Sequence, residues 1–371
     1  MIKLGSLFDG SGGFPLGGII AGMTPVWSSE IEPFPIRVTE KRLPAVRHYG
    51  DVSKLNGADL EPVDVITFGS PCQDMSVAGK RAGLDGARSG LFFQAVRIIK
   101  EMRAKYGRPR FAVWENVRGA LCSAGGEDFR RVLEELCRIK DDAADVPRPP
   151  KGKWQSAGCV MGDGYSIAWR VLDAQYWGVP QRRKRIYLVA DFDGDSAGKI
   201  LFESEGVSGH PEKMQSAWQD FARTAQNSAG ETGRGKVYLM SKLSHFTHAT
   251  PDQADTLVAT DYKSPPVVNA DWRVRMITPL ECARLQGFPD WWTDGLTDSE
   301  PSDAEVRKWQ GIFDEYCDIN GKKRKTASQV RRWLMTEPTD AAKYKMWGNG
   351  VALPCVVFVL AGIVWAAGED L

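Results

Sequence analysis

Three groups of residues in this chain have types and spacings that could do chemistry. The first is the sequence GSPCQ at residues 69–73, which directly follows an apolar run at residues 63–68. Proline fixes its own φ and keeps the residue before it extended, so Cys72 would be presented on a stiff loop. A thiol with an ordinary pKa of about 8.5 acts as a nucleophile only in a favourable electrostatic setting. Cys72 alone would therefore be interpreted as a small buried packing residue.

The second group would supply such a setting. Glu115, in the sequence WENV, follows the apolar run 111–114, and the sequence QRRKR at residues 181–185 leads into another apolar run. The carboxyl ends of parallel strands meet at one edge of an α/β sheet, so Glu115 would lie near Cys72. Arg183 and Arg185 alternate along the entering strand and would share a face toward anionic or carbonyl oxygens. A nucleophile and an acid at one sheet edge indicate a reaction centre.

The third group is a glycine-rich turn, FDGSGG, at residues 8–13. Glycines without Cβ atoms let the backbone approach a ligand, and Glu30 follows at the distance where a carboxylate binds ribose hydroxyls in nucleotide-binding folds. The pattern is not GxGxxG and no Walker lysine follows, which favours an adenosine ligand with an uncharged linkage, such as S-adenosylmethionine, over a phosphate-bearing one. A plain tight turn, with Glu30 as a surface acid beside Glu32, is the alternative interpretation.

These segments need an alternating arrangement of strands and helices to bring them together. Apolar runs typical of strands occupy residues 2–8, 24–29, 63–68, 111–114, 167–172 and 185–190, and residues 91–102 have a helical pattern. This alternation predicts a doubly wound α/β sheet. Residues 123–165, with a helix at 128–140 and a loop rich in proline and lysine at 147–153, are interpreted as an insertion near the active face.

Beyond residue 191 the alternation stops. Residues 192–271 are rich in Gly, Ser, Thr, Asp and Lys, which predicts a second, loop-rich domain, and residues 299–345 have a charged helical pattern. We therefore expect a large α/β domain followed by a smaller, loop-rich one.

Composition bounds the class of protein without deciding its function. The chain has 371 residues, of which 43% are hydrophobic and 26% charged, as in ordinary globular proteins. Seven cysteines without CxxC pairs indicate reduced thiols, and we expect neither a disulfide frame nor a metal site. The net charge of +1 does not indicate a nucleic-acid partner, although residues 182–185 and 322–325 are local basic clusters.

The two ends of the sequence bear on its location in the cell. The N-terminal residues show no export signal. The apolar run 351–367 is interrupted by Pro354 and Gly362, which favours a buried core helix over a membrane span. We expect a cytoplasmic protein.

In order along the chain, these segments resemble the motif set of the cytosine-5 DNA methyltransferase family, of the bacterial and phage restriction-modification type. The matching motifs are FDGSGG at 8–13, PCQ at 71–73, ENV at 115–117, QRRKR at 181–185, PLECARLQGFP at 279–289 and GNGV at 348–351. The resemblance covers residues 3–94, 111–120, 173–191, 275–292 and 346–359. Target specificity is expected in the remaining segments, 123–165, 192–271 and 299–345.

The resemblance implies a Rossmann-like sheet of the S-adenosylmethionine-dependent methyltransferase class. It also implies a discontinuous catalytic and cofactor-binding domain at 1–190 plus 341–371, with a smaller target-recognition domain at 191–340. The cofactor would be S-adenosyl-L-methionine, leaving as S-adenosyl-L-homocysteine, with no metal. Glu30 would hold the ribose, and Ile31 would pack on the adenine. The full set of residues that would form the pocket is Phe8, Asp9, Gly10, Gly12, Glu30, Ile31, Asp51, Val52, Pro71, Leu91, Asn349 and Val351.

The family mechanism that the resemblance implies adds the Cys72 thiolate to C6 of a cytosine. Glu115 would engage N3 and the exocyclic amine, and Arg185 would contact the ring carbonyl, so that C5 accepts the methyl group. A stacked cytosine is unreachable, so the base would be extruded from the duplex at a cost of a few kcal/mol. The residues expected to contact DNA are Gln73, Ser76, Arg88, Arg183, Thr256 and Leu257.

Some features depart from the family pattern or stay open. Gly350 stands where many members carry serine, and Asp9 stands where a small residue is frequent. The pair Thr256 and Leu257 is similar to a Thr-Leu dipeptide of the family's target-recognition region, and a short strand is the alternative.

The expected partner is double-stranded DNA, with a separately acting restriction endonuclease as a further option, no membrane, and a monomeric state. Methylation of structured RNA is one alternative function, against which the extended segment 192–271 argues. A non-catalytic DNA-binding protein on the same scaffold is another. The joint presence of Cys72, Glu115 and Arg185 favours an enzyme.

Overall fold

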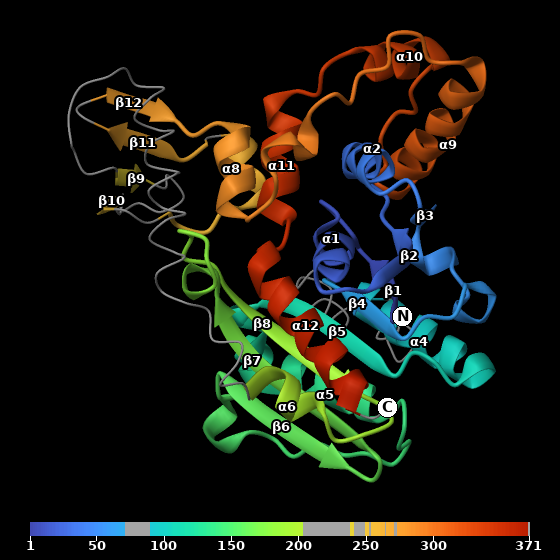
Figure 1. Cartoon of the computed structure of the whole chain (residues 1–371), viewed down its shortest axis with the longest axis vertical. Helices are drawn as coiled ribbons and strands as arrows, with labels where there is room; N and C mark the ends of the chain where they lie inside the picture. Colours follow the sequence, from blue (N-terminus) through green and yellow to red (C-terminus); the bar gives the residue numbers. More distant parts are fainter. Residues whose placement is uncertain are drawn as a thin grey trace.

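An eight-stranded sheet in the order β3-β2-β1-β4-β5-β8-β7-β6 forms the centre of the protein (Figure 1). The computed structural model describes residues 1–70, 90–202, 238–240, 249–251, 254–263, 265–270 and 273–369. The strands are β1 (Lys3–Leu7), β2 (Thr24–Ser29), β3 (Arg47–Tyr49), β4 (Val65–Phe68), β5 (Phe111–Val117), β6 (Ala157–Gly162), β7 (Tyr165–Asp173) and β8 (Lys184–Asp191). Strands β3, β2, β1, β4 and β5 run parallel to one another. β8 pairs antiparallel with β5, β7 with β8, and β6 with β7.

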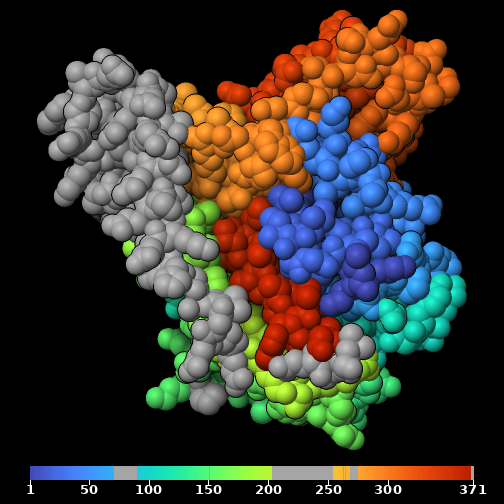
Figure 2. All heavy atoms as spheres, in the orientation of Figure 1, coloured from blue at the N-terminus to red at the C-terminus, as the bar shows by residue number. Residues whose placement is uncertain are grey.

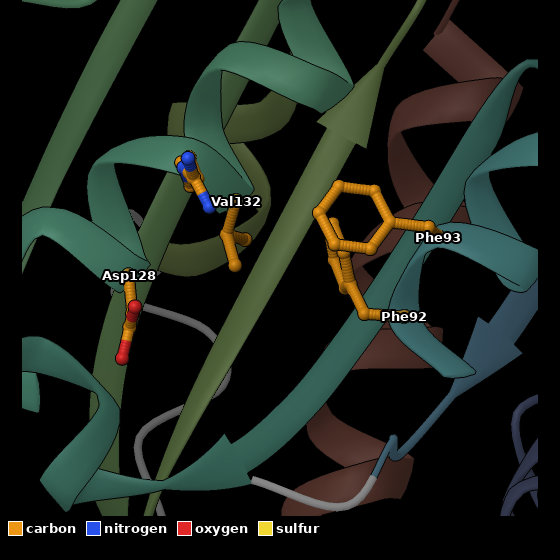
Figure 3. Close-up of a pocket in the computed structure, with 5 residues that line it drawn as sticks. Phe92, Phe93, Asp128 and Val132 are labelled. Atoms are coloured by element: carbon orange, nitrogen blue, oxygen red, sulfur yellow. The ribbon is translucent and has the colours of Figure 1, made fainter. Parts of the chain in front are cut away.

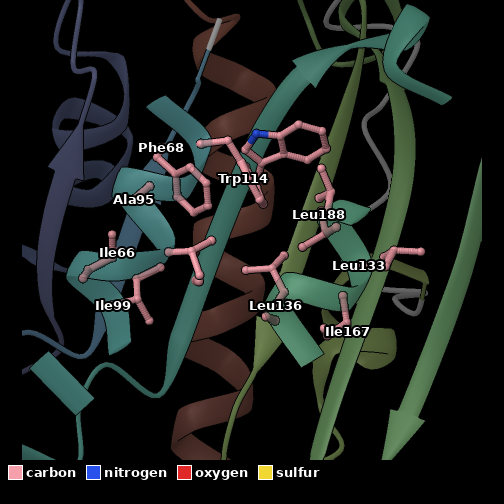
Figure 4. Packing of buried hydrophobic residues seen from close by; sticks show 14 of the residues in the cluster. Ile66, Phe68, Ala95, Ile99, Trp114, Leu133, Leu136, Ile167 and Leu188 are labelled. Atoms are coloured by element: carbon pink, nitrogen blue, oxygen red, sulfur yellow. The ribbon is translucent and has the colours of Figure 1, made fainter. Parts of the chain in front are cut away.

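Helices cover both faces of this sheet, which confirms the predicted doubly wound α/β class. On one face lie α4 (Leu91–Tyr106) and α5 (Glu127–Cys137), and on the other lie α1 (Gly13–Ile20), α6 (Ala197–Phe202) and α12 (Leu353–Glu369). Side chains alternate along a strand, so in β4 Ile66 joins the core under α4 and α5 (Figure 4), while Val65 joins the core under α12. Both faces are therefore buried, as parallel strands require.

The C-terminal helix α12 covers part of one face of the eight-stranded sheet. α12 is packed against α1 and α6, and Figure 2 shows the C-terminal residues between the N-terminal segment and the segment before residue 202. Among the described residues, no single helix is long and apolar enough to cross a membrane. Only α11 (Asp340–Asn349) and α12 taken together, as a pair bent at the break between them, reach that length and apolar character. The apolar run near the C-terminus is thus a core helix in this fold.

A second helical layer lies beside the ends of β2 and β3. It contains α2 (Pro33–Arg42), α9 (Asp303–Ile319) and α10 (Ala327–Met335), whose apolar side chains share one small core that includes Ile36. α8 (Pro279–Leu285) and α11 (Asp340–Asn349) join α2 in another core. Our predicted division places α9 and α10 in the second domain, whereas they pack on α2; the division itself stays a prediction.

The described parts of residues 192–276 contain a small antiparallel sheet in the order β10-β9-β11-β12. Its strands are β9 (Tyr238–Met240), β10 (Ala249–Pro251), β11 (Val267–Ala270) and β12 (Arg273–Met276). Figure 1 shows this sheet on the opposite side of α8 from the α9 and α10 pair.

Two strands of the main sheet were not predicted. β3 has only three residues, and β6 lies inside the segment that we interpreted as helix followed by loop. β6 is an edge strand whose glycines make room for rings on β7: a Cβ at Gly158 would lie 2.2 Å from the ring of Trp169, and one at Gly162 would lie 2.0 Å from Tyr165. The large apolar residues that indicate a strand in this hairpin are therefore in β7.

Candidate functional site

The glycine turn after β1 is held in a left-handed backbone conformation. Phe8, Gly10 and Gly12 have φ values of 56°, 54° and 80°, and Gly12 is the N-cap of α1. Such angles favour glycine, so the turn requires the two glycines that the sequence supplies. The non-glycine exception is Phe8, whose ring packs partly buried against the core under α4.

Glu30 ties this turn to the end of β2. One carboxylate oxygen accepts a hydrogen bond from Gly10 N at 2.8 Å, and the other accepts from Ile31 N at 2.8 Å and from Glu32 N at 2.9 Å. Burial raises the pKa of this carboxyl group, while the three backbone donors act in the opposite direction. Glu30 thus shapes the turn. Its Oε1 already accepts two hydrogen bonds, whereas Oε2 accepts one and can accept another from a ligand hydroxyl.

The end of β3 lies next to Glu30. Ser29 Oγ donates to Gly50 O at 2.6 Å, and Glu30 N donates to Tyr49 O at 3.2 Å. Asp51 then caps a short 3-10 turn by accepting from Ser53 N at 2.8 Å, and Val52 is buried. The structure therefore brings together the three predicted cofactor segments that begin at Phe8, Glu30 and Asp51.

The segment after α11 completes this side of the site. A Cβ at Gly13 would lie 2.4 Å from Val351, and a Cβ at Gly350 would lie 2.9 Å from Ser11 Oγ, so the two glycine-containing turns are in direct contact. Asn349 is exposed at the end of α11, and Leu91 is half-buried at the start of α4. The Gly350 departure from the family pattern thus makes room for the Ser11 hydroxyl.

Two polar side chains of the glycine turn are buried without a full set of partners. Asp9 Oδ1 accepts from Ser6 Oγ at 2.8 Å, whereas Asp9 Oδ2 and Ser11 Oγ have no hydrogen-bond partner among the described residues. Burial, with a further contribution from Glu30, raises the pKa of Asp9 to about 8. These unsatisfied atoms fit a pocket that holds a polar ligand.

The second part of the site is built where β4 and β5 end. A Cβ at Gly69 would lie 3.4 Å from Glu115 Oε2. Asn116 Nδ2 donates to Ser70 O at 2.8 Å, and Trp114 Nε1 donates to Ser70 Oγ at 3.2 Å. The chain is thus fixed beside Glu115 two residues before the predicted nucleophile.

Glu115 is buried beside two guanidinium groups. Arg185 Nε lies 3.3 Å from Glu115 Oε1 in an ion pair without a hydrogen bond, which leaves that oxygen available to a ligand. Burial raises the pKa of Glu115, and Arg185 and Arg183 offset that rise only in part. Both arginines therefore act on Glu115, as their alternation in the sequence predicts.

Arg183 has a different place from the one predicted. It is 3% exposed; Nη1 donates to Leu257 O at 3.0 Å and Nη2 donates to Gly350 O. Burial, together with the neighbouring Arg185, lowers the pKa of Arg183 to about 10. A contact of Arg183 with the DNA backbone has no support in this arrangement, because the guanidinium group is enclosed by protein carbonyls.

The predicted DNA contacts at Thr256 and Leu257 lie in a segment without strand structure. Thr256 Oγ1 donates to Arg182 O at 2.6 Å, and the Leu257 side chain is buried. These residues are joined to the QRRKR segment by backbone bonds, in which Ala254 N donates to Pro180 O at 2.9 Å and Arg182 N donates to Ala254 O at 2.8 Å. The short-strand alternative is wrong.

Five predicted residues lie outside the described part of the chain, and others were missed. Those outside are Pro71, Cys72, Gln73, Ser76 and Arg88. Gln181, the first residue of the QRRKR motif, is fully buried, and neither of its amide atoms has a partner among the described residues. Asn116, in the ENV motif, was missed as the support of Ser70.

The rest of the described structure adds little chemistry to this site. No group of three or more His, Cys, Asp or Glu side chains that could hold a metal ion occurs among the described residues. A cavity between α4 and α5, lined by Phe92, Phe93, Asp128, Arg131 and Val132 (Figure 3), has a volume of about 10 Å³. That volume holds about one water molecule.

Comparison with known proteins identifies the family. The model of the C-5 cytosine-specific DNA methylase family matches residues 2–139, 160–196 and 195–308. The chain belongs to this family of methyltransferases, and the resemblance seen in its motifs is confirmed.

Individual relatives agree with this assignment at the level of the methyltransferase class. The chain is 29% identical to a DNA N-6-adenine-methyltransferase of Escherichia phage P1, over 91% of this chain and 58% of that protein's length. It is 28% identical to the Type II methyltransferase M2.BsuMI of Bacillus subtilis, over 83% of this chain and 70% of that protein. The crystal structure of the Schizosaccharomyces pombe Dnmt2 methyltransferase has the same fold, with a TM-score of 0.53, 17% identity and coverage of 100% and 99% of the two chains.

Proposed function

We propose that this protein methylates C5 of cytosine in a short sequence of duplex DNA, with S-adenosyl-L-methionine as methyl donor and Cys72 as nucleophile. The observation that carries the proposal is the placement of Glu115. Its carboxyl group lies beside the Arg185 guanidinium and next to Gly69, at the sheet edge from which the chain continues to Cys72. An acid, a cation and a nucleophile-bearing loop at one edge are the groups that this chemistry needs.

The charge state of Glu115 suits the role proposed for it. Attack of the Cys72 thiolate on C6 forms a bond there and moves electron density from the C5–C6 double bond toward C5, N3 and the ring carbonyl. Glu115, whose pKa is raised by burial, would donate a proton to N3, and the Arg185 guanidinium would stabilise the ring oxygen. C5 would then take the methyl group that the cofactor supplies, and the N3 proton would return to the Glu115 carboxylate. Loss of the C5 proton to solvent would give back the electron pair that re-forms the C5–C6 double bond and expels the Cys72 thiolate.

The residues around the glycine turn fit the cofactor. Glu30 Oε2 would accept a hydrogen bond from a ribose hydroxyl, and Asp9 and Ser11 provide polar atoms without a partner among the described residues at the same turn. The proposed contacts also include Phe8, Ile31, Asp51, Val52, Pro71, Leu91, Asn349 and Val351. When bound, the cofactor supplies an electrophilic methyl group. The protein's part is to orient it above C5 and exclude water.

Methylation of adenine N6 is a second candidate, because a phage relative carries that name. The family match and the Glu115–Arg185 pair favour cytosine. Enzymatic digestion of DNA from cells that express the protein, followed by mass spectrometry of the nucleosides, separates the two. We expect 5-methylcytosine; N6-methyladenine alone would contradict the proposal.

Transfer of labelled methyl groups to duplex DNA and to tRNA tests the class of nucleic acid. We expect transfer to DNA and none to tRNA, and the reverse result would favour structured RNA as the substrate. Bisulfite sequencing would then locate the target cytosine and, with it, the recognition sequence of a restriction-modification system.

A further inference from the structure

The glycine turn contains a buried carboxyl group with one oxygen unused. Asp9 is 5% exposed, and its Oδ1 accepts from Ser6 Oγ, but its Oδ2 has no hydrogen-bond partner among the described residues. Ser11 Oγ, two residues later and 1% exposed, has none either. Buried polar atoms in folded proteins nearly always have a partner, so these two atoms favour a ligand with polar groups at this turn.

The electrostatic surroundings of Asp9 favour a cation over a neutral donor. The charged group acting on Asp9 within the described structure is the Glu30 carboxylate, while Ser6 and Gly12 contribute a hydroxyl and an amide that are already engaged. His48, which faces Glu30 from β3, has a pKa lowered by burial and stays neutral. Ionisation of Asp9 beside Glu30 is unfavourable, and a ligand cation at this turn would stabilise the ionised form.

We propose that Asp9 binds the cationic methionine end of S-adenosylmethionine and thereby favours ligands with a positive charge there over the uncharged 5′-methylthioadenosine, a role that rests on the proposed function. The cofactor carries an ammonium and a sulfonium group, its product S-adenosylhomocysteine carries the ammonium alone, and 5′-methylthioadenosine carries neither. Asp9 stands where a small residue is frequent in the family.

A consequence is that cofactor binding releases a proton. Burial keeps Asp9 protonated up to a pKa of about 8, and a bound cation favours the ionised form. Below pH 8 the affinity for the cofactor should therefore rise about tenfold per pH unit, because each unit raises the ionised fraction by about that factor. Without the carboxyl group this dependence should disappear.

Calorimetric titration of the full chain with the three compounds tests the proposal. At pH 8, Asp9→Asn should lower the affinity for S-adenosylmethionine about 10- to 100-fold, the range expected for a hydrogen bond to a charged group, and leave that for 5′-methylthioadenosine unchanged. An equal loss for S-adenosylhomocysteine assigns the contact to the ammonium, and a loss for S-adenosylmethionine alone assigns it to the sulfonium. The wild type should also release about one proton per cofactor near pH 7, and the variant none.

The matched control is Asp128→Asn, which changes another buried carboxyl group that accepts from a serine hydroxyl, that of Ser123. It should bind all three compounds like the wild type. The proposal is overturned if Asp9→Asn binds S-adenosylmethionine normally, or if it loses 5′-methylthioadenosine equally, since that would indicate a collapsed turn. A wild-type chain that binds none of the compounds would instead contradict the proposed function itself.

Discussion

At the scale of single residues, the site depends on acids that are kept away from water. Glu115 is buried with a raised pKa although two arginines are near it, so it holds its proton to a higher pH than a surface glutamate does. A neutral acid can donate to N3 of cytosine, whereas the nucleophile at Cys72 must be ionised. The two requirements together predict a rate that is limited by Cys72 at low pH and by Glu115 at high pH.

Replacement of Glu115 tests that assignment. In single-turnover methyl transfer, Glu115→Gln should lower the rate about 10²- to 10⁴-fold, the contribution expected of a general acid, and should abolish the fall in rate as pH rises through the pKa of Glu115. The rise at low pH should remain, because it belongs to the thiol. If the variant kept the same decline at high pH, another group would be the acid.

Asn116 is a positioning residue that acts through Ser70. Its Nδ2 holds Ser70 O at 2.8 Å, two residues before Cys72. Asn116→Ala should therefore lower kcat about 10²-fold, as expected when a reacting group shifts by about 1 Å, with little change in cofactor affinity. Asn56→Ala, which removes an exposed asparagine that accepts from Ala58 N, is the control and should leave kcat unchanged. Equal rates for both variants and the wild type would remove Asn116 from the site.

At the scale of elements, the end of α11 touches the backbone of the segment that carries Thr256 and Leu257. A Cβ at Gly348 would lie 2.2 Å from Val258 C and O and 2.4 Å from Ala259 N. Backbone atoms cannot move aside as a side chain does, so Gly348→Ala should lower the free energy of unfolding by about 1–3 kcal/mol.

A glycine in helix α9 provides the control for that prediction. Gly311 is exposed inside α9, with open space around the position of a Cβ. Gly311→Ala should raise the free energy of unfolding by about 0.5–1 kcal/mol, because alanine is the better helix former. Urea denaturation measures both variants. A harmless Gly348→Ala would show that α11 and the 254–263 segment are not in close contact.

The sequence allowed a strand to be predicted where the residues of that strand alone have a pattern typical of strands. Short runs rich in apolar and β-forming residues marked β1, β2, β4, β5, β7 and β8, because most of their side chains are buried in the cores on the two faces of the sheet. β6 could not be predicted in this way, since it has glycines where the aromatic rings of β7 need room. The approach of Arg185 to Glu115 followed from strand ends and alternation. The burial of Arg183 did not, because its partners, Leu257 O and Gly350 O, are distant in the sequence.

At the scale of the whole molecule, Arg183 connects three parts of the chain. Its guanidinium donates to Leu257 O and Gly350 O and acts electrostatically on Glu115, so one side chain links the segment after residue 253, the turn after α11 and the acid of the site. Arg183→Lys keeps the charge but cannot span two carbonyls with a planar fork. We expect weaker binding of both cofactor and DNA, and a free energy of unfolding about 2–4 kcal/mol lower.

The neighbouring Arg182 is the control, since its side chain is exposed and its backbone makes the bond to Ala254. Arg182→Lys should match the wild type in denaturation and in cofactor binding. If Arg183→Lys behaved in the same way, the three parts would be held together by their other contacts.

The central claim is that Cys72 forms a covalent bond to C6 of a cytosine in DNA. The most direct measurement uses duplex DNA in which every cytosine is replaced by 5-fluorocytosine, so that no recognition sequence need be known. With S-adenosylmethionine present, the fluorine cannot leave C5 as the proton does, so the covalent intermediate cannot break down. We therefore expect an adduct that survives denaturation and maps by mass spectrometry to the peptide containing Cys72. Transfer of methyl groups to cytosine in ordinary DNA without any such adduct, or with an adduct at another residue, would contradict it.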